Sequence, residues 1–311
     1  MLCEQWRGSV FYTYYRFIEA RKMSFNIVVL AKQVPDTRNV GKDAMTPQGT
    51  VNRAALPAIF NPEDLNALEL ALRIKDAHPG TTIQVVTMGL PKAAEVIREG
   101  LFRGADGGVL VTDRALAGAD TLATSYVLAQ TIQKMGHVDL VIGGRQAIDG
   151  DTAQVGPQVA QKLDIDQVTY VEAVEALDES SVTVMRRIDG GVERVKAPLP
   201  VLLTVTGSAA PCRPRNAKLV MKYKRALAPA EQRADLPYAE EYARKAYLTI
   251  PQWGAADIDA DIEQCGLAGS PTKVKTVQNV VFATKESRRL TGSDADVEQL
   301  IVELLDSHTI G

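Results

Sequence analysis

The pattern of apolar and polar positions divides most of the chain into short strands and longer helices. Apolar runs typical of buried parallel strands occur at residues 25–30, 82–88, 108–112 and 138–143. The segments between them repeat apolar residues every three or four positions and predict helices over 62–77, 91–102, 121–135 and 152–163. This alternation predicts βαβ units with right-handed crossovers, and therefore an α/β fold with a doubly wound parallel sheet.

The pattern changes after residue 165. Strands are predicted at 168–176, 182–187 and 192–196, with Asp189, Gly190 and Gly191 forming a hairpin turn between the last two, and another strand at 201–206. Residues 213–225 are basic, the chain from 226 onward is polar and weakly patterned, and a last helix is predicted at 295–305. We expect an α/β domain over 23–212. Residues 213–311 should form an arm that packs on this domain or on a partner subunit.

The first 22 residues differ from the rest because they concentrate aromatic side chains in a chain that contains only 5% of them. They lack the apolar run of a signal peptide, and an amphipathic membrane anchor is the other functional alternative. We interpret residues 1–22 as an extension outside the fold, with the natural start at Met23.

Composition excludes several classes of protein. A net charge of -3 and few aromatics argue against nucleic-acid binding. Cys3, Cys212 and Cys265 are far apart, which indicates a reducing compartment, and we expect a cytoplasmic protein. With three scattered histidines a metal site is not expected. No apolar run is long enough for a membrane span.

The richest strand end is the segment 143–157. Its two leading glycines let the backbone approach a ligand, Asp149 and Gly150 make a turn, and Asp151 or Thr152 can cap the next helix. Free amides at that helix start suit a phosphate, and Arg145 adds positive charge. The alternative is a strand, a turn and a capped helix without a ligand. Neither GxGxxG nor a Walker loop is present.

Two other segments have both a structural and a functional interpretation. Residues 117–125 form a small-residue loop that leads into a helix, and Asp120 can cap that helix. The hydroxyls of Thr121, Thr124 and Ser125 have two interpretations: they support the helix start alone, or they cradle a flavin. Residues 61–64 begin a helix, with Asn61 as N-cap, and can also form one wall of a nucleotide pocket.

No side chain is predicted to be catalytic. There is no nucleophile elbow or triad, His137 precedes a strand and should face solvent, and Asp149 and Asp151 are better placed as caps than as an acid–base pair. Any redox chemistry would therefore be carried by a cofactor.

The run QAIDGDTAQVGP at 146–157 closely resembles the signature of electron transfer flavoprotein beta subunits. Further similar segments follow the family's order and spacing from about residue 25 to 221: VVLAKQVPDT, NPEDLNALELAL, VTMGLPKA, GADGGVLV, VTYV, RRIDGG and LPVLLTV. The resemblance implies an adenine-nucleotide-binding α/β domain in a heterodimer whose alpha subunit carries FAD.

In ordinary members of this family the beta subunit binds AMP and the dimer shuttles electrons. In electron-bifurcating members it binds a second FAD, which NADH reduces, and electrons divide between ferredoxin and an acyl-CoA dehydrogenase-type partner. Four segments resemble the bifurcating type: the DGDTAQ turn, the AGADTLATS segment, VPDT at 34–37 and GSPT at 269–272. This resemblance favours FAD over AMP in the beta subunit. A stand-alone adenine-nucleotide sensor of the universal-stress type is a third alternative, but it would leave the arm without a partner.

The resemblance also assigns residues. Predicted nucleotide contacts are Leu30, Ala31, Asn61, Asp64, Met88, Gly89, Gly144, Arg145, Gln146, Ala147, Asp149, Gly150, Thr152, Ala153, Gln154, Val155 and Gly156, with Thr121 and Thr124 at the flavin. The basic stretch 214–225 resembles the loop that docks on the acyl-CoA dehydrogenase through a leucine, which would be Leu219. This segment departs from the family pattern by being shorter after that leucine.

Overall fold

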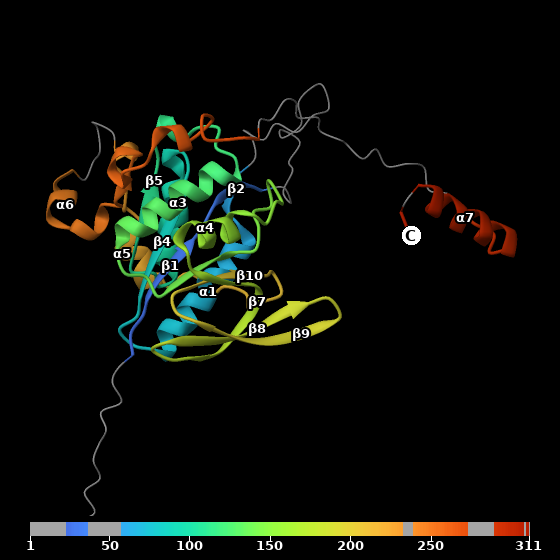
Figure 1. The fold of residues 1–311 in the computed structure, drawn as a ribbon. Coiled ribbons are helices and arrows are strands. Elements are labelled where there is room, and N and C mark those ends of the chain that lie inside the picture. Colours follow the sequence, from blue (N-terminus) through green and yellow to red (C-terminus); the bar gives the residue numbers. More distant parts are fainter. Residues whose placement is uncertain (1–22, 37–56, 233–238, 273–288, 308, 311) are drawn as a thin grey trace, which may run out of the picture.

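A computed structural model describes residues 23–36, 57–232, 239–272, 289–307 and 309–310; the predicted extension at 1–22 lies outside them. Their main feature is a nine-stranded sheet with the order β11-β5-β4-β1-β6-β10-β7-β8-β9 (Figure 1). It is parallel from β11 to β7, and β7, β8 and β9 pair antiparallel. The strands are β1 (Asn26–Leu30), β4 (Thr82–Met88), β5 (Gly107–Val111), β6 (Leu140–Gly144), β7 (Asp166–Leu177), β8 (Ser181–Ile188), β9 (Gly191–Pro198), β10 (Val201–Val205) and β11 (Gln252–Trp253).

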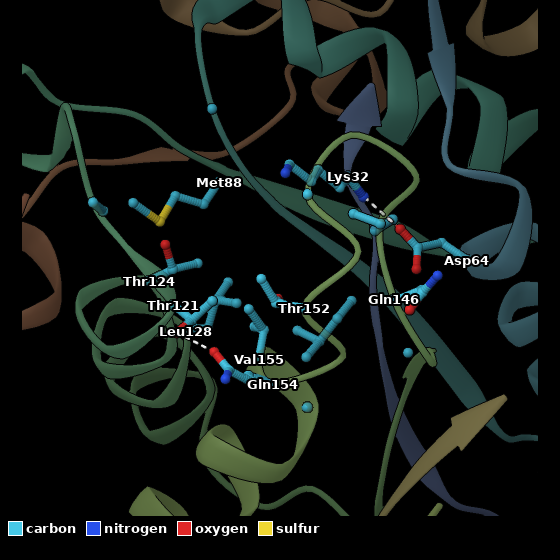
Figure 2. Close-up of a pocket in the computed structure, with 18 of the residues that line it drawn as sticks. Lys32, Asp64, Met88, Thr121, Thr124, Leu128, Gln146, Thr152, Gln154 and Val155 are labelled. Carbon is cyan, nitrogen blue, oxygen red and sulfur yellow. Dashed lines mark hydrogen bonds between the residues drawn. The ribbon is translucent and has the colours of Figure 1, made fainter. Parts of the chain in front are cut away.

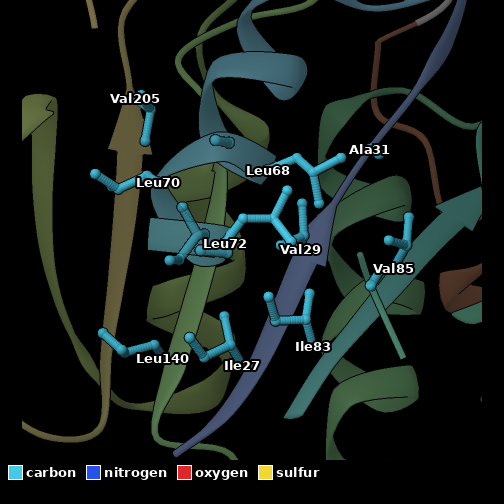
Figure 3. Packing of buried hydrophobic residues seen from close by; sticks show 14 of the residues in the cluster. Ile27, Val29, Ala31, Leu68, Leu70, Leu72, Ile83, Val85, Leu140 and Val205 are labelled. Atoms are coloured by element: carbon cyan, nitrogen blue, oxygen red, sulfur yellow. The ribbon is translucent and has the colours of Figure 1, made fainter. Parts of the chain in front are cut away.

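Helices cover both faces of the sheet, as the alternating pattern predicts. On one face α1 (Pro62–Ala77) and α2 (Ala94–Arg103) share a core with Ile27 and Val29 of β1 (Figure 3). On the other face α3 (Thr121–Met135) and α4 (Val155–Leu163) share a second core with Val28 and Leu30. Successive strand residues point to opposite faces, so β1 supplies both cores, and this confirms the doubly wound α/β fold.

The antiparallel part extends the sheet beyond its parallel strands. β7 lies beside β10, and the hairpin β8–β9 is attached to β7. A separate two-stranded sheet pairs β2 (Gln33–Pro35) with β3 (Ala58–Phe60). The predicted hairpin is therefore present, and it is one edge of the main sheet.

Much of the chain after residue 213 packs against the α/β domain. The helix α5 (Ala217–Tyr223) lies against α2 and buries Tyr223, and β11 adds to the edge of β5. Ala255, Ile258 and Cys265 belong to the second core. The helix α7 (Asp294–Asp306) differs because none of its residues is buried. The predicted boundary at residue 213 remains a prediction. None of the described helices is both long and apolar enough to cross a bilayer.

Candidate nucleotide-binding site

A cavity of about 600 Å³ opens at the carboxyl ends of β1, β4, β5 and β6 (Figure 2). In doubly wound sheets this edge is where ligands bind. The cavity brings together all the predicted nucleotide contacts except Asn61, which is buried behind it, and Asp149, which is not among the lining residues. Lys32, Leu128, Thr112, Asp113 and Leu116 also line the wall but were not among the predicted contacts. Lys32, Thr112 and Asp113 lie just beyond strand ends, which is the signal that could have identified them, whereas Leu128 lies within α3.

Asp64 ties the two central strands together at the base of the cavity. Its carboxylate accepts hydrogen bonds from the amide of Lys32, 2.8 Å away, and from the amide of Gly144, 2.9 Å away. Lys32 follows β1 and Gly144 ends β6. Burial raises the pKa of Asp64 to about 7, although these amides favour the ionised form. The residue predicted to touch a nucleotide therefore also fixes the shape of the site.

Gly144 is required by protein packing. A Cβ at this position would lie 2.4 Å from Asp64 Oδ1 and 2.8 Å from the Asp64 amide nitrogen. The absence of a side chain lets the end of β6 approach the first turn of α1. This glycine therefore has a structural explanation, and its role in making room for a ligand remains a prediction. Gly150 differs, since a Cβ there would meet no atom within 4 Å.

The first turn of α1 also holds the loop that follows β6. Asn61 stands at the N-cap as predicted, but its side chain makes no capping bond; it donates to the carbonyl of Gln146 and accepts from the amide of Ile148. Glu63 accepts from the amide of Gln146 and pairs with Arg145, whose Nη2 is 3.1 Å from Oε1. The charge of Arg145, predicted to serve a ligand, is therefore already neutralised by Glu63.

The loop from Asp149 to Gln154 is not helical, which corrects two predictions. α4 begins at Val155 rather than at 152, and neither Asp151 nor Thr152 caps it. Asp151 and Ala153 have φ values of 49° and 52°, so left-handed conformations interrupt the expected helix. Asp151 accepts instead from the side chain of Gln146.

This loop leaves hydrogen-bond donors available to the cavity. In the described part of the chain the amides of residues 152–156 donate to no protein acceptor, and all five residues line the cavity. Unpaired amides before and within the first turn of a helix attract anions. The segment predicted to bind phosphate therefore has suitable donors, although the helix starts three residues later.

The start of α3 forms the opposite wall. Asp120 caps it, as predicted, by accepting from the amides of Leu122 and Ala123. The hydroxyl of Thr121 donates to Gln154 Oε1, 2.9 Å away, and so joins α3 to the loop. Thr124 lies beside Met88 at the end of the cavity remote from Asp64 (Figure 2). Ser125, also considered as a flavin contact, is buried and donates to the carbonyl of Leu122, so it does not reach the cavity.

A segment near the C-terminus is attached at the same wall. Ser270 accepts from the amide of Asp120, and the amide of Thr272 donates to the Asp120 carboxylate. Burial opposes ionisation of this carboxyl, but the amides it accepts outweigh that effect and hold its pKa below the usual range. The segment 269–272, singled out in the sequence, is thus bonded to Asp120, which lines the cavity together with most of the DGDTAQ turn.

The predicted partner-docking residue lies away from the cavity, on α5. Leu219 is half-buried and packs against the core, whereas Met221 is 66% exposed. The charges of Arg213 and Arg215 pair with Glu69 and Glu99, so the basic character of this stretch at the surface comes mainly from its lysines. The docking role of Leu219 remains a prediction.

A doubly wound sheet with an anion-attracting cavity at its strand ends is the architecture of a nucleotide-binding domain. Residues 48–231 match the electron transfer flavoprotein domain. Because this match covers more than half of the chain, the protein belongs to the electron transfer flavoprotein family, and its relatives identify it as a beta subunit.

Three relatives illustrate the similarity. The CarD subunit of the caffeyl-CoA reductase–Etf complex of Acetobacterium woodii is 45% identical over 248 residues, covering 80% of this chain and 85% of the relative. The electron transfer flavoprotein subunit beta of Clostridium acetobutylicum is 44% identical, covering 80% and 86%. The FixA protein of Sinorhizobium fredii is 42% identical, covering 81% and 82%.

Proposed function

We propose that this beta subunit binds FAD in the cavity and pairs with an alpha subunit that carries a further FAD. In this proposal the heterodimer works in the cytoplasm and moves electrons from NADH to an acyl-CoA dehydrogenase-type partner and to ferredoxin. The observation that carries it is the extent of the cavity, which runs without interruption from the free amides of 152–156 to Met88, Thr124 and Leu128. The similarity to a subunit of a caffeyl-CoA reductase–Etf complex supports it.

The lining residues fit the parts of FAD in order. The amides of 152–156 would hold the diphosphate, and the small residues 117–119 leave room beyond it for a planar ring system. Met88 and Leu128 supply apolar contact there, and Thr124 supplies a hydroxyl. A bound flavin accepts a hydride and passes electrons on singly. The surrounding residues would bind and orient it.

AMP is the main alternative, because it needs the same phosphate site. It would use only the part of the cavity near the 149–156 loop and leave the wall at Met88 and Thr124 without a ligand. A stand-alone nucleotide sensor is less well supported, because the relatives at 42–45% identity include a named beta subunit and a subunit of a reductase complex.

We also propose that α7 packs on the alpha subunit. Val297, Ile301 and Leu305 are 45–47% exposed and lie on one side of the helix at intervals of four residues. An apolar stripe of this kind is normally covered by another surface.

Nucleotide content tests the proposal. The chain is co-expressed with its alpha subunit, the purified complex is denatured, and the released nucleotides are quantified by chromatography. The proposal expects two FAD per heterodimer. One FAD and one AMP would refute it and favour the ordinary shuttle, and a nucleotide-binding protein that forms no complex would favour the sensor.

The assignment of the flavin end has its own test. Thr124→Tyr should fill the space beside Met88 and lower FAD in the beta site at least severalfold, while the alpha-subunit FAD remains. Gln133→Tyr is the matched control, because Gln133 lies on the exposed side of the same helix. Equal flavin content in both variants would contradict the assigned ring position.

A further inference from the structure

Most charged groups that line the cavity are already satisfied by the protein. Arg145 pairs with Glu63, and the carboxylates of Asp64 and Asp120 accept backbone amides. Lys32 is also paired, with its Nζ 2.8 Å from Oδ1 of Asp149. This pair differs from the others because both of its side chains are open to solvent, 49% and 23% exposed. An ion pair this open to solvent contributes little to stability and is easily exchanged.

The position of Lys32 is fixed although its head group is accessible. Its amide donates to Asp64, and its carbonyl accepts from the amide of Asn61 at 2.9 Å. The side chain therefore starts from a rigid point just beyond the end of β1 and reaches toward the loop after β6 (Figure 2). Asp149, its partner, lies three residues before the first free amide of that loop.

We propose that Lys32 breaks its ion pair with Asp149 and binds the diphosphate of the nucleotide instead. This inference rests on the proposed function, in that it assumes a phosphorylated nucleotide at the free amides of 152–156. Of the two cations that line the described cavity, Lys32 is the one whose acidic partner comes from a solvent-accessible loop. The exchange replaces a weak ion pair with a charge-assisted hydrogen bond to phosphate.

Asp149 then opposes the ligand. In the unliganded protein it neutralises Lys32, and after the exchange its carboxylate remains beside a phosphate of the same sign. Like charges at short range repel, so Asp149 lowers affinity in two ways: it competes for Lys32 and it repels the ligand. The two residues of one ion pair should consequently have opposite effects on nucleotide binding.

The experiment compares ligands with and without phosphate on the full-length chain, purified and freed of nucleotide. ADP and adenosine are titrated by calorimetry into the wild type, Lys32→Met, Asp149→Asn and the control Lys218→Met, which removes an exposed lysine from α5. Lys32→Met should weaken ADP binding about ten- to a hundredfold and change adenosine binding little. Asp149→Asn should strengthen ADP binding roughly two- to fivefold. Lys218→Met should match the wild type.

The outcomes separate this inference from the proposed function. If the wild type binds neither ADP nor adenosine, the nucleotide site itself is refuted. If the wild type binds ADP and Lys32→Met binds it equally well, the role of Lys32 is refuted and the site stands. An equal loss for both ligands would also refute it, because it would show a structural effect. Weaker ADP binding by Asp149→Asn would refute the exchange.

Discussion

Asp64 should make the stability of the unliganded protein depend on pH in an unusual direction. It is a buried carboxyl group at the base of the cavity, and burial raises its pKa from 3.8 to about 7. In the unfolded chain the same group would ionise near its ordinary value. Between pH 4 and pH 7 the folded state therefore holds a proton that the unfolded state has released. The free energy of unfolding must fall as pH rises through this window and level off above pH 7.

The magnitude follows from the size of the shift. A difference of about three pH units corresponds to about 4 kcal/mol over the whole window, and about 2 to 3 kcal/mol of it falls between pH 5 and pH 7.5. Carboxyls with lowered pKa values, such as Asp178 at about 2, act in the opposite direction but at lower pH. The interval from pH 5 to pH 7.5 therefore avoids the contribution of these carboxyls.

Urea denaturation of nucleotide-free protein at several pH values measures this effect. The wild type should lose about 2 to 3 kcal/mol more than Asp64→Asn between pH 5 and pH 7.5, because the asparagine side chain cannot titrate. The variant also controls for every other titrating group. Parallel profiles in the two proteins would refute the argument, because the pH dependence would then come from elsewhere. Carbon-13 NMR of the Asp64 carboxyl provides a direct second measurement.

Two further pairs of substitutions test the packing around the site and the surface of α5. Gly144→Ala should lower the free energy of unfolding by about 2 kcal/mol or more and abolish nucleotide binding. Gly150→Ala should change neither property. Comparable urea midpoints for the two variants would contradict the close approach of β6 to α1. Leu219→Ala should lower the free energy of unfolding by about 1 to 2 kcal/mol, whereas Met221→Ala should leave it within about 0.5 kcal/mol of the wild type. Thermal melts of both variants measure this, and a lower melting temperature for Met221→Ala than for Leu219→Ala would show that Leu219 is the exposed residue.

The sequence predicted the regular elements well where local signals agreed. The bounds of α3, Thr121–Met135, match the prediction, because a capping aspartate precedes its apolar stripe and Gly136 follows it. β4 likewise spans the predicted 82–88. The edge strand β11 was not predicted, since a two-residue strand is specified by pairing with β5 and carries no periodicity of its own.

The candidate site was located from sequence, but the detailed roles of its residues were not. Arg145 and Glu63 are 82 positions apart, so no local pattern reveals that one neutralises the other. The start of α4 was misplaced for a different reason. Glycine at position 150 suggested where the chain turns, yet the left-handed residues are Asp151 and Ala153. Tertiary contacts decided these features.

The insertion of β10 between β6 and β7 has a consequence for biosynthesis. In a chain emerging from the ribosome, β1, β4, β5 and β6 are available early, but one edge of β6 keeps unpaired backbone groups until residues 201–205 appear. The same late strand joins β7 to the rest and accepts the amide of Arg145 at Val205. The candidate nucleotide site is therefore completed only after about two thirds of the polypeptide has been made, and until then a nascent chain exposes a strand edge that can associate with other chains.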